Sequence, residues 1–149
     1  MERLVLDTGV LVEYIVLRSP YRPVVAKLFE EATAKRLELY VNVITLSETL
    51  YVASRIYRAA KVSKPNREAL DFIEWIMSKA RVVDVSTDIA LRAGELKKRL
   101  RIALPDCYVL ATAQAVGATP LFRKPEEEMR PVMNELRELG VKFLDEIKP

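Results

Sequence analysis

Short apolar runs alternate with longer amphipathic stretches along this chain. Runs of strand length occur at residues 3–6, 37–43, 81–85, 119–122 and 141–144. Stretches with helical periodicity occupy about residues 8–17, 20–35, 45–60, 67–79, 87–100, 104–116 and 126–139. Because helices separate the strands, right-handed crossovers would place helices on both faces of a parallel sheet. The pattern therefore predicts one α/β domain over residues 1–149, with a mostly parallel sheet of about five strands.

Local signals indicate where some of these helices begin or end. Ser19 is a suitable N-cap for the second helix, and Pro20 suits its first helical position. Thr45 and Glu48 have the Thr-x-x-Glu spacing of a capping box at the start of a long helix. Gly117 is a typical residue for the end of the helix at 104–116.

The composition restricts the chemistry available to the chain. It has 149 residues, a formal net charge of +3, one cysteine and no histidine. Mechanisms that need imidazole are therefore excluded, and catalysis would depend on carboxylates, lysines, hydroxyls or the single thiol. The N-terminal region contains no apolar segment long enough for a signal peptide or a membrane span. We expect a soluble cytoplasmic protein that does not associate with membranes.

Three acids follow strand ends or begin helices in this layout. Asp7 directly follows the first apolar run, Glu48 lies near the start of the helix after the second strand, and Asp106 lies in the first turn of a later helix. Strand carboxyl ends and the amino ends of crossover helices share one edge of a parallel sheet. We therefore expect Asp7, Glu48 and Asp106 to face the same rim.

Each acid also has a purely structural interpretation. Asp7 or Thr8 would serve as the cap of the following helix. Glu48 would complete the capping box with Thr45, and Asp106 would interact favourably with the helix dipole. Three acids from distant parts of the chain are harder to explain by capping alone than one.

Gathered carboxylates repel one another, and this repulsion predicts a compensating feature. The protein would raise a carboxyl pKa, supply a lysine, or bind a cation. Oxygen ligands without histidine or cysteine favour Mg²⁺ or Mn²⁺. Such an ion would activate water for hydrolysis of a phosphodiester.

Three motifs resemble those of the PIN-domain family, and in size and layout the chain looks most like the toxin nucleases of VapBC toxin–antitoxin pairs. The motifs are Leu6-Asp7-Thr8, Leu46-Ser47-Glu48-Thr49-Leu50 and the segment Leu104–Ala113. The resemblance implies a Mg²⁺- or Mn²⁺-dependent ribonuclease acting on single-stranded RNA. It implies that Asp7, Glu48 and Asp106 are the metal-binding and catalytic acids, with Thr8 in support.

The chain departs from the family pattern after the fourth predicted strand. Many members have a hydroxyl residue and then an acid there, but Phe122 and Lys124 occupy the corresponding places. Glu126, Glu127 or the following Glu128 would substitute for that acid, although each is equally well explained as an acid in a first helical turn. Lys124 would alternatively pair with the carboxylates.

Contacts with substrate and partners have candidate regions as well. The basic residues Lys97, Lys98, Arg99 and Arg101 precede Asp106 and are candidates for binding RNA phosphates. A solvated helix end is the alternative interpretation of this cluster. The helices at 45–60 and 67–79 would provide a homodimer surface or an antitoxin groove, although burial against the chain's own sheet explains most of their apolar residues.

Two functional hypotheses result. The first is a metal-dependent endoribonuclease that cleaves single-stranded RNA, as the toxin of a toxin–antitoxin pair. The second is a PIN-fold RNA- or protein-binding module with weak or no catalysis, which the acid missing at Lys124 favours.

Overall fold

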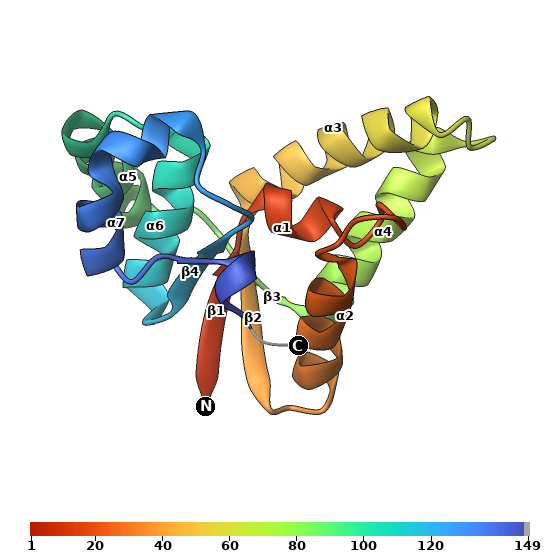
Figure 1. Cartoon of the computed structure of the whole chain (residues 1–149), viewed down its shortest axis with the longest axis horizontal. Helices are drawn as coiled ribbons and strands as arrows, with labels where there is room; N and C mark the ends of the chain where they lie inside the picture. Colours follow the sequence, from red (N-terminus) through yellow and green to blue (C-terminus); the bar gives the residue numbers. More distant parts are fainter. Residues whose placement is uncertain (148–149) are drawn as a thin grey trace.

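Five parallel strands form the sheet of the computed structural model, which describes residues 1–147 (Figure 1). The strands are β1 Glu2–Leu6, β2 Leu37–Asn42, β3 Arg81–Val83, β4 Thr119–Phe122 and β5 Lys142–Phe143. Their spatial order is β3-β2-β1-β4-β5, and every neighbouring pair is parallel. The predicted α/β class and parallel sheet are confirmed.

Helices cover both faces of this sheet. The α-helices are α1 Thr8–Val12, α2 Arg22–Thr33, α3 Val43–Ala59, α4 Pro65–Lys79, α5 Thr87–Leu100, α6 Leu104–Val116 and α7 Met133–Glu138. Two 3-10 helices, η1 Glu127–Val132 and η2 Leu144–Glu146, lie near the C-terminal end. Among the described residues no helix is both long and apolar enough to span a membrane.

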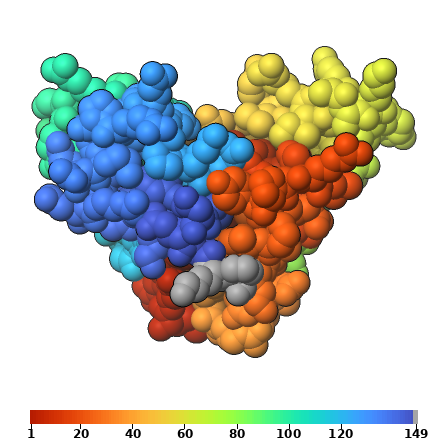
Figure 2. All heavy atoms as spheres, viewed as in Figure 1, coloured from red at the N-terminus to blue at the C-terminus, as the bar shows by residue number. Residues whose placement is uncertain are grey.

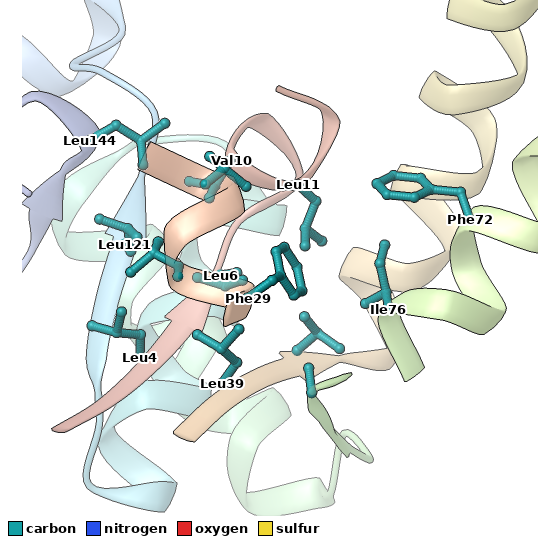
Figure 3. Close-up of a cluster of buried hydrophobic side chains, with 14 of the residues drawn as sticks. Leu4, Leu6, Val10, Leu11, Phe29, Leu39, Phe72, Ile76, Leu121 and Leu144 are labelled. Atoms are coloured by element: carbon teal, nitrogen blue, oxygen red, sulfur yellow. The ribbon is translucent and has the colours of Figure 1, made fainter. Parts of the chain in front are cut away.

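The alternation of side chains along β1 divides the core into two clusters. Leu4 and Leu6 pack with residues of α1, α2 and α4, as Figure 3 shows. Val5 points to the opposite face and packs with residues of α5 and α6. All three side chains are fully buried. A central parallel strand is covered on both faces, which explains why residues 4–6 form an uninterrupted apolar run.

An aromatic cluster attaches the long helices to the first of these cores. Trp75 of α4 stacks on Tyr14 with ring centroids 4.5 Å apart, and it contacts Phe29 of α2 at the same distance. Phe72 stacks on Tyr14 at 6.2 Å. These contacts hold the α3–α4 hairpin, which extends away from the sheet in Figure 1, against the domain.

The strand order creates a switch point beside β1. The chain leaves β1 for β2 on one side, whereas β4 pairs with β1 on the other side. In open parallel sheets, ligands bind outside the carboxyl ends of strands at such a point. The backbone N–H of Asp7 donates to Leu121 of β4 at 3.1 Å, which places Asp7 at this position.

Two predicted helix starts are wrong. The second helix begins at Arg22 with Tyr21 as its N-cap, while the Ser19 hydroxyl accepts from the Tyr21 N–H in the preceding turn. The long helix α3 begins at Val43, because the side chain of Asn42 accepts the Thr45 N–H at 2.8 Å. Glu48 consequently lies in the second turn and forms no capping box.

Two other helices are shorter than predicted. The first helix ends at Val12 rather than near residue 17. The segment expected to be one helix over 126–139 is divided into η1 and α7, and Pro131 lies inside η1. Proline lacks the N–H that a continuous α-helix needs at that position.

Asn42 joins three elements at the edge where the acids gather. It is fully buried at the end of β2, caps α3, and donates to the Thr112 hydroxyl of α6 at 3.1 Å. The sequence interpretation missed this residue, although Asn before a helical pattern is a recognised N-cap signal.

We expect Asn42→Ala to lower the free energy of unfolding by about 2 kcal/mol, because a cap and a buried hydrogen bond are lost together. Urea denaturation monitored by circular dichroism measures this change. Asn66→Ala, on the exposed start of α4, is the control and should change stability by less than about 0.5 kcal/mol. Equal effects of the two substitutions would contradict the linking role of Asn42.

Candidate active site

The sequence left two roles open for Asp7, as the cap of the first helix or as an acid at the rim of the sheet. In the structure Asp7 caps α1 and also lies at that rim. It is the N-cap of α1, and its Oδ2 accepts the Gly9 N–H at 3.1 Å. A Cβ at Gly9 would lie 3.3 Å from this oxygen and 3.3 Å from Cβ of Arg123. Glycine therefore allows Arg123, which follows β4, and the Asp7 carboxylate to approach the start of α1 closely.

Thr8 connects the first acid to α3. It is buried within α1 and accepts a hydrogen bond from the Thr49 hydroxyl at 3.3 Å. Thr49 is the neighbour of Glu48, so this contact couples the positions of Asp7 and Glu48. Thr8 is not the helix cap, because Asp7 has that role.

Asp106 is a buried acid at the start of α6. It lies in the first turn of α6, and its side chain is only 6% exposed. Its Oδ2 is buried and has no hydrogen-bond partner within the described part of the chain. Buried polar atoms are nearly always paired, so this oxygen is available to a ligand from outside the chain.

Two glutamates after β4 approach Asp106. Carboxylate oxygens of Asp106, Glu126 and Glu128 all lie within 4.8 Å of one another, and Glu127 does not belong to this group. Glu128 also accepts the Ala103 N–H at 2.9 Å, next to the start of α6. The buried side chain of Met129 anchors the segment in the second core.

The electrostatics of the site follow from burial and like charges. Burial raises the pKa of Asp106 to about 8, assisted by the charges of Asp7, Glu126, Glu128 and Glu48. Burial also raises the pKa of Asp7 to about 7; the Gly9 N–H opposes this shift, and the charges of Glu48 and Glu126 add to it. Asp7 and Glu48 therefore belong to the same electrostatic cluster as Asp106.

No basic side chain within residues 1–147 neutralises the cluster. None of the ion pairs there involves Asp7, Glu48, Asp106, Glu126 or Glu128. Lys124 is exposed and forms no ion pair with these acids, so the prediction that it would pair with them is wrong. Of the three compensations considered from the sequence, proton binding and cation binding remain.

The residues present fit a divalent cation. Hard cations prefer several carboxylate oxygens, and the cluster offers these together with the unpartnered Oδ2 of Asp106. Asp106, Glu126 and Glu128 are the acids whose oxygens lie close enough together to hold one ion. Asp7 and Glu48 act on Asp106 through their charges but lie outside this group. Glu126 and Glu128, but not Glu127, are therefore the candidates for the acid that the family pattern places after the fourth strand.

A partly buried ion pair next to the site was not predicted. Glu13, which is 7% exposed, pairs with Arg123 and accepts the Ser19 hydroxyl. The Arg123 guanidinium also lies 5.6 Å from the ring centroid of Tyr21. These contacts engage Arg123 on the side of the α1–α2 connection. No local sequence signal joins residues 110 positions apart.

Three of the four basic residues at the end of α5 have partners within the protein. Lys97 donates to the Ile102 carbonyl at 2.7 Å, Lys98 pairs with Glu95, and Arg99 lies 3.9 Å from Glu135. Arg101 adopts a left-handed conformation at the C-cap of α5. These contacts favour the alternative interpretation, a solvated helix end.

The single cysteine does not suit nucleophilic chemistry. Cys107 is fully buried, and burial together with the charge of Asp106 raises the pKa of its thiol to about 11. A thiol with this pKa is almost entirely protonated near neutrality.

Comparison with known families agrees with this geometry. The family model described as the PIN domain matches residues 4–123. The chain belongs to the PIN domain family. The match includes Asp7, Glu48 and Asp106 and ends immediately before Lys124. Among proteins of curated function, none matches the chain significantly in sequence.

Solved structures share the PIN fold over nearly the whole chain. A chain of VapBC2 from Rickettsia felis, bound to a DNA fragment from its promoter, has a TM-score of 0.69 and 20% identity, with 95% of this chain and 98% of that chain covered. For DNA-bound VapBC from Salmonella typhimurium, the TM-score is 0.68 and the sequence identity 18%, with 97% of this chain and 99% of that chain covered. For VapC20 from Mycobacterium tuberculosis, a toxin that cleaves the sarcin-ricin loop, the TM-score is 0.65 and the sequence identity 14%. The match covers 86% of this chain and 94% of that chain.

The raised pKa values predict how metal-free stability depends on pH. Folding raises the pKa of Asp7 and Asp106 above 3.8, so between about pH 5 and 8 the folded state binds more protons than the unfolded chain. The stabilisation that the extra bound protons provide is complete below the pKa of these acids in the unfolded chain, and it is lost as pH rises through 7 to 8. The melting temperature in EDTA should therefore fall over this range.

Asp106→Asn should reduce that fall and raise the melting temperature at pH 8.5 in EDTA by roughly 3 °C, or on the order of 1 kcal/mol, since it removes a buried charge. Differential scanning calorimetry of both proteins measures the effect. Mn²⁺ should stabilise the parent protein more at pH 8 than at pH 5, because it binds deprotonated acids. An identical pH slope for the two proteins in EDTA would contradict this account.

Proposed function

We propose that this PIN domain is a divalent-metal-dependent endoribonuclease that acts on single-stranded RNA. The observation that carries the proposal is the buried, unpartnered Oδ2 of Asp106 within a cluster of acids at the carboxyl edge of the sheet. A cluster without cationic partners gains most from an external cation, and family membership associates such acids with nuclease chemistry.

The side chains have separable roles in this proposal. Asp7 and Asp106 hold the ion, and Glu126 supplies the acid that is absent at Lys124. Glu48 binds the ion directly or accepts a proton from the attacking water, because it is partly exposed on α3 beside the two buried acids. The bound Mg²⁺ or Mn²⁺ would lower the pKa of a water molecule and stabilise charge that develops on the phosphate. Thr8 and Asn42 keep the elements that carry these acids in place.

We further propose that the protein acts in the cytoplasm as the toxin of a toxin–antitoxin pair and forms a homodimer. Similarity to VapBC structures from Rickettsia felis and Salmonella typhimurium supports an antitoxin partner. Similarity to VapC20, a toxin that cleaves the sarcin-ricin loop, supports an RNA substrate.

A binding module without efficient catalysis is the second candidate. The observation in its favour is Lys124, which stands where many family members have an acid. Under this alternative the protein binds RNA or a protein, and no divalent metal produces cleavage.

Purified protein should cleave a mixed-sequence single-stranded RNA in Mn²⁺ or Mg²⁺ but not in EDTA. Asp7→Asn and Asp106→Asn should each lower the cleavage rate at least about a hundredfold, because each removes a charged ligand. A gel assay with end-labelled RNA measures the rates, and identically purified variants control for contaminating nucleases. Full activity in both variants would overturn the site, whereas inactivity of antitoxin-free parent protein with every metal would favour the binding module.

The substitute acid can be tested with its neighbour as a matched control. Glu126→Gln should weaken Mn²⁺ binding about tenfold, since one charged ligand is lost near Asp106. Glu127→Gln removes the same charge one residue away, outside the cluster, and should change Mn²⁺ affinity less than about twofold. Isothermal titration calorimetry gives both affinities. Equal losses would show that net charge, rather than ligation by Glu126, governs binding.

A further inference from the structure

The outer face of α3 continues outward from the acidic cluster. After Glu48, this helix carries Tyr51, Arg55 and Arg58 at intervals of three, four and three residues. That spacing places all four side chains on one helical stripe. Tyr51 is 60% exposed, and both arginines are exposed. A large aromatic ring and two cations thus extend over about 15 Å of helix from the catalytic edge.

The charged side chains of residues 49–67 are all basic. Residues 49–67 contain no acid, and their basic residues are Arg55, Arg58, Lys61, Lys64 and Arg67. Within residues 1–147 only Arg67 of this set forms an ion pair, with Asp71. The basic cluster at the end of α5 differs, because three of its members are engaged by protein oxygens.

Tyr51 and Arg55 form a preorganised surface pair. The Arg55 guanidinium lies 5.5 Å from the Tyr51 ring centroid, and its Nη1 is 3.4 Å from the tyrosine hydroxyl. Together with Ser54, Arg58 and Ala59 they line a shallow depression of about 400 Å³. Aromatic rings bordered by cations are the usual platform for single-stranded nucleic acids, because bases stack while phosphates meet charge.

The shape of the molecule connects this face with the acids. In Figure 1, α3 leaves the carboxyl edge of the sheet on one side, and the segment after β4 rises on the other. Figure 2 shows the surface notched between α3, in yellow, and the blue residues near 125–130. A strand leaving this notch along α3 would meet Tyr51 first and then the two arginines.

We propose that Tyr51, Arg55 and Arg58 form a track for single-stranded RNA that leads away from the cleavage site. Tyr51 stacks on a base, and Arg55 and Arg58 contact successive phosphates. The proposal rests on the proposed function, because it takes RNA as the substrate of the acidic site. The unpaired cations favour a polyanion over an apolar protein surface as the occupant of this face.

Fluorescence anisotropy with a labelled 12-nucleotide mixed-sequence RNA, in EDTA to prevent cleavage, tests the track. Tyr51→Ala should weaken binding about tenfold, while Tyr51→Phe retains it. Arg55→Gln with Arg58→Gln should reduce the slope of log K against log salt by about 1.4, because each single-strand phosphate contact contributes about 0.7. Tyr51→Ala should leave that slope unchanged.

A charge-matched control separates the track from net charge. The double variant Lys27→Gln, Arg36→Gln removes one positive charge from α2 and one from the turn before β2. Strand β2 begins at the end of the sheet opposite the acids, so this variant should preserve the salt slope of the parent protein. Reduced affinity in Tyr51→Ala and a reduced slope only in the α3 double variant would support the proposal. Parent-like RNA binding by both α3 variants would overturn it and assign this face to a protein partner.

Cleavage in Mn²⁺, measured on the same preparations, distinguishes the two levels of inference. Parent protein that cleaves RNA, with α3 variants that bind it equally well, would retain the proposed function and reject the track. If the α3 variants lose RNA binding as expected but the parent protein does not cleave RNA, the track is supported and the nuclease function is rejected. Parent protein that neither binds nor cleaves RNA would overturn both.

Discussion

Repulsion among carboxylates held together in a partly buried place is the constraint on which this structure depends. Asp106 contributes a buried oxygen without a partner among the described residues, and burial, followed by the charges of the nearby acids, raises its pKa. An unfolded chain would separate these charges in water, so the site itself opposes folding at neutral and higher pH. Functional sites commonly concentrate unfavourable electrostatics that the rest of the protein must offset.

The two cores supply that offset and also set the geometry. Residues 4–6 of strand β1 are buried on both faces and directly precede Asp7, so the position of the first acid follows from packing of the sheet. Asn42 connects the end of β2 with α3 and α6, and the Thr8–Thr49 contact connects α1 with α3. Each acid therefore lies on an element that buried contacts hold in place, as preorganised charge requires.

The surface divides into regions of opposite charge that suit one polyanionic substrate. The acidic edge would repel phosphate unless a cation is bound, which makes metal and substrate binding interdependent. The exposed face of α3 has the opposite character, since residues 49–67 contain cations and no acid. A shared helix places Glu48 and Tyr51 one turn apart, so binding along α3 and chemistry at the edge would act on the same strand of RNA.

The sequence by itself determined the parallel α/β sheet and singled out Asp7, Glu48 and Asp106 as candidate site residues, because strand ends and helix starts are local patterns in the chain. Tertiary structure decided the features that depend on distant segments. Packing of Met129 in the second core brings Glu126, rather than Glu127, towards Asp106. Glu13 meets Arg123 from 110 residues away. The fold brings Glu135 of α7 to Arg99, whereas Arg55 and Arg58 of α3 have no acidic partner within residues 1–147. Periodicity encodes which face of an element is buried, but side-chain contacts across elements arise only once the sheet is assembled.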